Sequence, residues 1–133
     1  IEFHIAHPEG YGFSKSDEEM LENTGTNVSI SEDPIQAVRD ANVVYTDVWA
    51  SMGQEKEREK RLKDFDGYTV TDSLFRLAAT NSIFLHCLPA HPGEEVERSV
   101  LDSDRSRIWE QAENRMHAAR GFLLHLFQEG NHK

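Results

Sequence analysis

Residues 42–47 read Asn-Val-Val-Tyr-Thr-Asp (NVVYTD). The two valines and the tyrosine of this run favour an extended strand, and its apolar content suits a strand that is buried on both faces. Such a strand belongs to a parallel sheet that has helices on either side. The flanking sequence should then alternate between strands and helices.

The sequence on both sides of this run alternates in that way. Three further apolar runs are expected to be strands, at 1–6, 27–31 and 82–88. Helices are expected at 16–23, at 34–41, from 71 to about 80, and at 107–127. Residues 54–66 (QEKEREKRLKDFD) are strongly charged, which suits either an exposed helix or a mobile loop. This alternation predicts a three-layer αβα, Rossmann-like α/β fold with a parallel sheet and right-handed crossovers.

Capping signals mark the starts of three of these helices. Ser16 and Glu19 have the spacing of a capping box, in which the two side chains satisfy each other's backbone N–H groups. Asp33 before Pro34 predicts an N-cap followed by a proline in the first turn. Thr71 predicts the N-cap of the next helix.

The last helix has the clearest apolar periodicity. Its apolar residues recur in steps of four and three, which is the period of an α-helix. They are Ile108, Ala112, Met116, Ala119, Leu123 and Leu126. We therefore expect one stripe of this helix to be buried.

Composition and charge limit the kinds of partner. The 133 residues correspond to about one domain, and 38% of them are apolar. The net charge of −10 argues against a nucleic-acid partner and against attraction to an anionic membrane, and no apolar run is long enough to span a bilayer. The single cysteine cannot form an internal disulfide, which suits a reducing cytoplasm. Because the chain starts with Ile1 inside a strand-like run, we expect a fragment or a processed product.

Two chemically distinctive segments follow the third and fourth strands. Asp47 to Gly53 comes after one strand, and Cys87 to Ala90, within FLHCLPAH (84–91), comes after the other. Ligands of open parallel sheets bind beyond the carboxyl ends of the strands. We therefore expect both segments to meet in one crevice. Taken alone, such a cysteine is usually a small buried apolar residue, and such an aspartate a cap.

Four segments resemble the signatures of the ornithine carbamoyltransferase family. DVWASMGQE (47–55) resembles its Asp-x-Trp-x-Ser-Met-Gly signature, and HCLPAH (86–91) resembles its His-Cys-Leu-Pro signature. AENRMH (112–117) resembles its C-terminal Glu-Asn-Arg element, and HPEGY (7–11) resembles a strand end found there. The segments occur in family order across nearly the whole chain, which makes chance agreement improbable.

This resemblance implies an enzyme that transfers a carbamoyl group from carbamoyl phosphate to the δ-amine of L-ornithine, giving L-citrulline and phosphate. It implies no metal and no organic cofactor. The positions that match ornithine-binding residues are Asp47, Ser51 and Met52. Cys87 and Leu88 match positions at the junction of carbamoyl phosphate and ornithine.

The residue types suit these implied roles. The α-ammonium of an amino acid needs an anionic partner such as Asp47, and Ser51 can hydrogen-bond to the same head group. Arg115 matches the family's arginine that holds carbamoyl phosphate, and a planar guanidinium suits phosphate and carbonyl oxygens. The δ-amine must lose a proton before it attacks, and Cys87, with an ordinary pKa of about 8.5, is a candidate partner in that transfer. The sequence leaves open whether Cys87 is the base or only shapes the pocket.

Other residues receive structural interpretations. Trp49 is expected to pack against the protein rather than touch substrate. The seven histidines invite a metal site, but no pair has ligand spacing on a helix with a third ligand nearby, so no metal site is predicted.

The resemblance covers one domain of a two-domain subunit, and that domain only in part. Residues 1–133 match the ornithine-binding domain, whereas the N-terminal carbamoyl phosphate-binding domain is absent from this sequence, as is the family's first ornithine-domain strand, which lies inside the sheet. We therefore expect the isolated chain to make no appreciable citrulline and to expose apolar surface. Complete family members are trimers or larger assemblies.

Two other functions stay open at this stage. The chain could be an inactive fragment or an amino-acid-binding module. It could also be part of a related carbamoyltransferase with another amine acceptor, although the intact Ser-Met-Gly segment favours ornithine over putrescine.

Overall fold

The computed structural model describes residues 1–50, 53 and 55–130. The strands are β1 (Glu2–Ala6), β2 (Asn27–Ser31), β3 (Val43–Thr46) and β4 (Ile83–His86). The helices are α1 (Lys15–Asn23), α2 (Pro34–Val38), α3 (Arg58–Asp64), α4 (Asp72–Phe75), α5 (Arg98–Leu101) and α6 (Ile108–Gly130), with a 3₁₀ turn, η1 (Glu55–Glu57), before α3. The charged segment 54–66 thus contributes a helix rather than only a loop.

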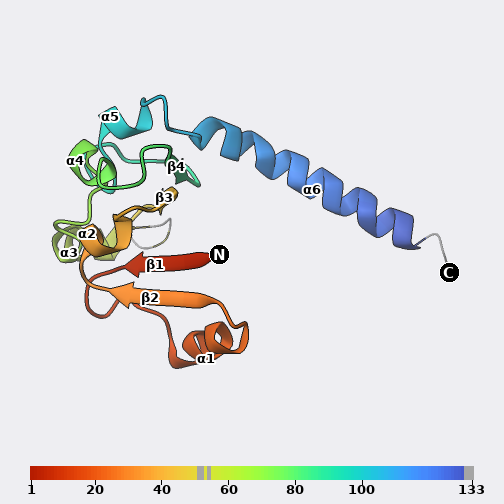
Figure 1. The fold of residues 1–133 in the computed structure, drawn as a ribbon, viewed down its shortest axis with the longest axis horizontal. Coiled ribbons are helices and arrows are strands. Elements are labelled where there is room, and N and C mark those ends of the chain that lie inside the picture. The colour runs from red at the N-terminus through yellow and green to blue at the C-terminus, as the bar shows by residue number, and fades with distance from the viewer. Residues whose placement is uncertain (51–52, 54, 131–133) are drawn as a thin grey trace.

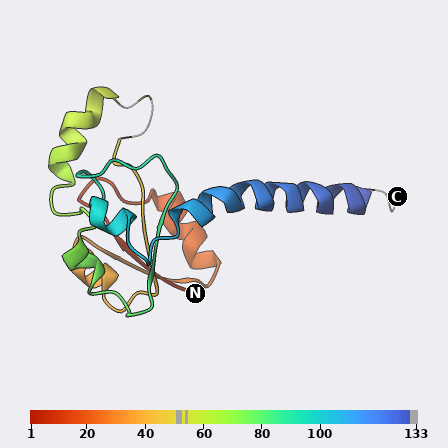
Figure 2. The ribbon, with the colours of Figure 1, turned by 90° about the horizontal axis from the view of Figure 1, so that it is seen from above.

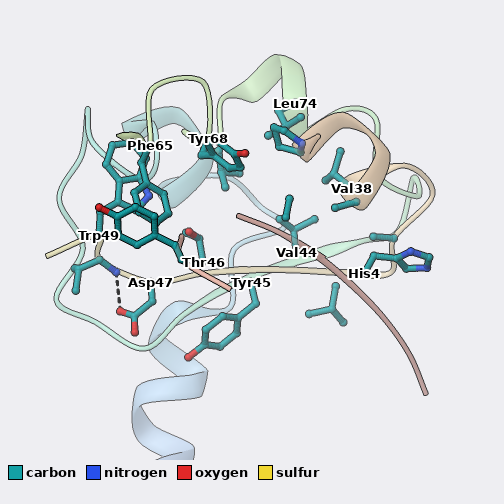
Figure 3. Close-up of a pocket in the computed structure, with 18 of the residues that line it drawn as sticks. His4, Val38, Val44, Tyr45, Thr46, Asp47, Trp49, Phe65, Tyr68 and Leu74 are labelled. Atoms are coloured by element: carbon teal, nitrogen blue, oxygen red, sulfur yellow. Dashed lines mark hydrogen bonds between the residues drawn. The ribbon is translucent and has the colours of Figure 1, made fainter. Parts of the chain in front are cut away.

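Strands alternate with helices and pair in parallel, which confirms the predicted α/β class. β1 pairs with β2 and β3 pairs with β4, so the described strands form two two-stranded sheets. The outer edge of β4 is covered, because the Phe84 N–H donates to the Arg105 carbonyl and the Arg107 N–H donates to the Phe84 carbonyl. β1 and β3 instead face a pocket of about 440 Å³, which both strands line (Figure 3).

The chain segments that follow β1 and β3 meet, although the two strands belong to different sheets. Tyr11 follows β1 and Trp49 follows β3, and the rings of both lie against Phe65, with centroids 4.8 Å and 5.5 Å away. The carboxyl ends of the two strands are therefore on the same side of the molecule. This is the side on which a parallel sheet binds its ligands.

The caps explain where the helices begin, with one correction. Asp33 accepts from the Ile35 N–H at 2.9 Å and Thr71 accepts from the Leu74 N–H at 3.0 Å, so both predicted N-caps are confirmed. The capping box predicted at Ser16 and Glu19 is wrong. Ser14 caps α1 instead, because its N–H donates to the Asp17 carboxylate while the Asp17 N–H donates to the Ser14 hydroxyl.

The core lies almost entirely beside β3 and β4. Its buried apolar residues are Val38, Val44, Val70, Phe75, Ala78, Phe84, Val96, Val100, Leu101 and Ile108. The prediction that β3 is buried on both faces is wrong: Val44 is buried, whereas Val43 is 49% exposed and Tyr45 is 54% exposed. Both exposed side chains line the pocket between the two sheets, so this face of β3 is not filled by core side chains.

α6 leaves the body of the protein soon after it begins, as Figures 1 and 2 show. Ile108, in its first turn, is buried, and the Gln111 amide oxygen accepts from the His86 N–H at 2.9 Å. The predicted buried stripe is wrong beyond that point, since Met116, Leu123 and Leu126 are each at least half exposed. Periodicity identified an apolar face but not a surface that covers it, and the expected exposure of apolar area is confirmed. Within the described residues, no helix has both the length and the apolar content needed to cross a membrane.

Candidate active site

Asp47 and Cys87 meet at the carboxyl ends of β3 and β4, as the topology predicted. The parallel register places Thr46 opposite His86, so the next residue of each strand lies at the same level. The Cys87 thiol donates a hydrogen bond to Asp47 Oδ1 over 2.9 Å. The Val48 N–H donates to the same oxygen over 2.7 Å and so helps to fix the carboxylate.

The surroundings of Cys87 favour its protonated form. Burial raises the pKa of the Cys87 thiol above its ordinary value, and the hydrogen bond to the Asp47 carboxylate raises it further. A hydrogen bond with the Tyr45 hydroxyl acts in the opposite direction but is the smaller effect. At neutral pH Cys87 is therefore mainly a thiol, which keeps its proton and donates a hydrogen bond to Asp47, and only a small fraction is thiolate.

This state predicts a slow reaction of Cys87 with alkylating agents. Only the thiolate is nucleophilic, so the folded chain should react with iodoacetamide at pH 7.5 more slowly than the urea-unfolded chain. Asp47→Asn should speed the reaction of the folded chain, because it removes the negative charge that opposes ionisation. The rates can be followed by intact mass. A rate that Asp47→Asn leaves unchanged would contradict this account of the thiol.

The turn after Cys87 is held by a buried pair, His86 and Glu95. Both side chains are fully buried, and His86 Nε2 donates to Glu95 Oε1 over 3.1 Å. The other ring nitrogen, Nδ1, accepts from the Leu88 N–H at 2.9 Å, which assigns the imidazole as neutral with its proton on Nε2. Glu95 Oε1 also accepts from the His91 N–H at 2.6 Å, so one carboxylate closes the loop between residues 86 and 95.

Leu88 shows why this turn needs support. Its φ is +60°, a left-handed conformation that costs an L-residue about 1–2 kcal/mol. The hydrogen bond from its N–H to His86 offsets part of that cost. The side chain of Leu88 thereby lies in a pocket of about 770 Å³ that Cys87 and Arg115 also line. The structure thus brings together three of the predicted site residues, Cys87, Leu88 and Arg115.

The remaining predicted residues are placed differently. Asp47 lines the pocket between the two sheets and reaches Cys87 through the hydrogen bond described above. Ser51 and Met52 lie outside the described residues, so their roles stay predictions. Trp49 packs against the protein as expected, with its ring stacked on Phe65 at an interplanar angle of 22°.

Most of the side chains that could ligate a metal already form hydrogen bonds or ion pairs within the protein. Asp47, His86 and Cys87 lie close enough to share an ion, as do His91, Glu94 and Glu95. In the first group the thiol binds Asp47, and both ring nitrogens of His86 hold hydrogen bonds. In the second, Glu94 is ion-paired with Arg58.

Sequence reasoning missed three polar residues that shape the site. Glu95 carried no signal, because its pairing with His86 depends on the conformation of the turn between them. Gln111 could have been suspected as an amide in the first turns of the helix expected to follow β4. Arg61 lies within the charged run 54–66, for which an exposed helix or a mobile loop was expected, yet its guanidinium donates to the Trp49 carbonyl over 3.2 Å.

Comparison with known proteins agrees with this geometry. The model of the family "Aspartate/ornithine carbamoyltransferase, Asp/Orn binding domain" matches residues 1–126. An ornithine carbamoyltransferase from Caldicellulosiruptor saccharolyticus is 44% identical over 93% of this chain and 42% of its own length. One from Staphylothermus marinus is 49% identical over 90% of this chain and 39% of its own length.

Solved structures give the same result. The ornithine carbamoyltransferase from Pyrococcus furiosus superposes with a TM-score of 0.83 at 44% identity, covering 92% of this chain and 41% of that one. The anabolic enzyme from Campylobacter jejuni superposes with a TM-score of 0.86 at 33% identity, covering 96% and 44%. This chain therefore spans about two fifths of the length of its relatives. By sequence and by fold, the chain belongs to the aspartate/ornithine carbamoyltransferase family, within which it corresponds to the Asp/Orn-binding domain.

Proposed function

We propose that this chain forms the amine-acceptor part of an ornithine carbamoyltransferase site within a longer, two-domain subunit. The reaction joins the δ-nitrogen of L-ornithine to the carbonyl carbon of carbamoyl phosphate, breaks the bond from that carbon to the phosphate oxygen, and releases L-citrulline and phosphate. The observation that carries the proposal is the contact between Asp47 and Cys87, which stands at the carboxyl ends of neighbouring parallel strands.

Each residue receives a role that its surroundings support. Among the described residues, both hydrogen bonds to the Asp47 carboxylate go to Oδ1, so Oδ2 can receive an ammonium group of ornithine or its proton. Because the raised pKa keeps Cys87 protonated, we assign it the role of holding Asp47 and bordering the amine rather than that of base. Leu88 borders the same site. Arg115 binds carbamoyl phosphate from the pocket of about 770 Å³ that it lines together with Cys87 and Leu88. Ser51 and Met52 hold the amino-acid head group.

The partners follow from the same proposal. The N-terminal domain of the subunit supplies the rest of the carbamoyl phosphate site, and the complete protein is a homotrimer or larger. The pocket between β1 and β3 supports the expectation that one more strand belongs inside the sheet. The free Cys87 thiol suits a reducing compartment, and we propose the cytoplasm.

The test is a fusion that restores the missing part of the subunit. This chain replaces the matched part of the Pyrococcus furiosus protein, and the purified fusion is assayed for citrulline with carbamoyl phosphate and ornithine. We expect turnover by the fusion, none above background by the 133-residue chain alone, and much weaker use of putrescine. A folded fusion that makes no citrulline would count against the proposal, and a fusion that prefers putrescine would point to the other acceptor.

A further inference from the structure

The segment that follows β3 is anchored by a cluster of side chains that the proposed reaction does not use. This anchor consists of Tyr11, Trp49, Arg61, Asp64 and Phe65. Tyr11 comes from the chain after β1, and Trp49 comes from the chain after β3. Arg61 and Asp64 belong to α3, and Phe65 immediately follows it. Three parts of the chain that are distant in sequence therefore meet beside the carboxyl ends of two strands.

Arg61 is the centre of this anchor. Its Nη1 donates to the Trp49 carbonyl over 3.2 Å, and its Nε and Nη2 donate to Glu57 Oε2 over 3.3 Å and 3.1 Å. Its guanidinium carbon lies 5.3 Å from the centroid of the Tyr11 ring, within the range of a cation–π contact. The side chain is only 20% exposed. Three neighbours therefore restrict the rotamers that the Arg61 side chain can adopt.

The other members keep Arg61 and Trp49 in place. The Tyr11 hydroxyl donates to Asp64 Oδ2 over 2.7 Å, and Lys60 binds the same oxygen over 2.5 Å. Lys60 and this hydroxyl hold the pKa of Asp64 below its usual value, so Asp64 stays charged at neutral pH. Phe65 lies between the rings of Tyr11 and Trp49. The position of Trp49 is therefore set by contacts with α3 and with the chain after β1.

The anchor reaches Asp47 through the backbone. Asp47 Oδ1 accepts from the Val48 N–H over 2.7 Å, so the direction of the carboxylate depends on where the backbone at Val48 lies. Arg61 holds the carbonyl of the next residue, Trp49. We propose that Arg61 is a positioning residue for the acceptor site, which holds the Trp49 carbonyl and through Val48 directs the Asp47 carboxylate toward Cys87 and the amine. This inference rests on the proposed function.

Two measurements test it, one of which does not depend on the reaction. In the 133-residue chain, Arg61→Met should speed alkylation of Cys87 toward the rate of Asp47→Asn, because a misdirected carboxylate no longer opposes ionisation of the thiol. In the active fusion, Arg61→Met should raise the KM for ornithine about tenfold, the lower end of what one hydrogen bond to a charged group contributes, with a smaller change in kcat. Arg61→Lys keeps the charge and should return both values to within about threefold of the parent.

The matched control is Arg76→Met. Arg76 forms the same kind of pair, four residues from its partner, with its Nε 2.7 Å from Asp72 Oδ2, but it is 73% exposed and bonds to Asp72 rather than to the chain after β3. This control should change neither value. An Arg61→Met chain that matches this control in both measurements overturns the inference, and so does faster alkylation with an unchanged KM.

If the parent fusion is inactive, the proposed function fails instead, and alkylation of the 133-residue chain still decides whether Arg61 directs Asp47. If Arg61→Met fails to fold, Arg61→Lys and Glu57→Gln are compared in its place, and Glu57→Gln should then show faster alkylation than Arg61→Lys.

Discussion

Asp47→Asn in the active fusion is expected to lower kcat/KM for ornithine by about 10²- to 10⁴-fold, the range associated with loss of a positioned general base. Asparagine has nearly the same shape, and its amide oxygen can still accept from the Cys87 thiol and the Val48 N–H. The charge is lost, so the side chain can neither pair with an ammonium group nor take a proton. Steady-state kinetics with ornithine as the varied substrate measures the effect.

Whether Asp47→Asn changes kcat or KM shows whether Asp47 acts in the transition state or only binds the substrate. A loss confined to KM would mean that Asp47 only pairs with the ammonium group, whereas a loss in kcat would mean that it acts in the transition state. Asp66→Asn is the control, because Asp66 is an exposed aspartate in the turn after α3. A fall of less than about tenfold in kcat/KM for Asp47→Asn would remove Asp47 from the list of essential residues.

Glu95→Ala is expected to have the largest effect on stability, lowering the free energy of unfolding by about 3–5 kcal/mol through a cavity and two buried donors left without an acceptor. The substitution leaves the His86 Nε2–H and the His91 N–H without their acceptor, and it opens a void where a fully buried side chain stood. A typical domain has only about 5–15 kcal/mol of stability, so much of the fold's margin would be lost. Urea unfolding followed by circular dichroism gives the value.

The neighbouring glutamate is the matched control. Glu94 pairs with Arg58 at the surface, where the arginine side chain is 46% exposed, so Glu94→Ala should cost no more than about 1 kcal/mol. Glu95→Gln keeps an acceptor oxygen for His86 and His91 and should fall between the two alanine variants. Equal unfolding midpoints for Glu95→Ala and Glu94→Ala would show that the buried pair contributes little to stability.

What the sequence could predict was set by backbone rules. Parallel strands end on the same side of a sheet, so the meeting of Asp47 and Cys87 followed from the order of the elements and was confirmed. The caps at Asp33 and Thr71 depend on neighbouring residues only, and they were confirmed as well. At α1, both Ser14 and Ser16 are possible N-caps. The spacing from Ser16 to Glu19 predicted Ser16, whereas Ser14 makes the capping hydrogen bonds.

What the sequence could not predict depends on how loops bend. The contacts from Arg61 to Trp49 and from His86 to Glu95 join residues whose separation has no fixed period, so no pattern announces them. The periodicity of α6 correctly predicted an apolar stripe. Burial of that stripe also requires a second surface to pack against it, and periodicity gives no information about such a surface.

The uneven core has a consequence for how the chain opens. Every buried apolar side chain of the core comes from residue 38 or later, whereas β1, α1 and β2 have none among their described side chains. We therefore expect residues 1–31 to open as a separate cooperative unit, with a lower opening free energy than the unit around β3 and β4. In native-state hydrogen exchange, its amides would be the first to lose protection. Any molecule or segment that fills the seam between the two units would raise their opening free energies together by mass action.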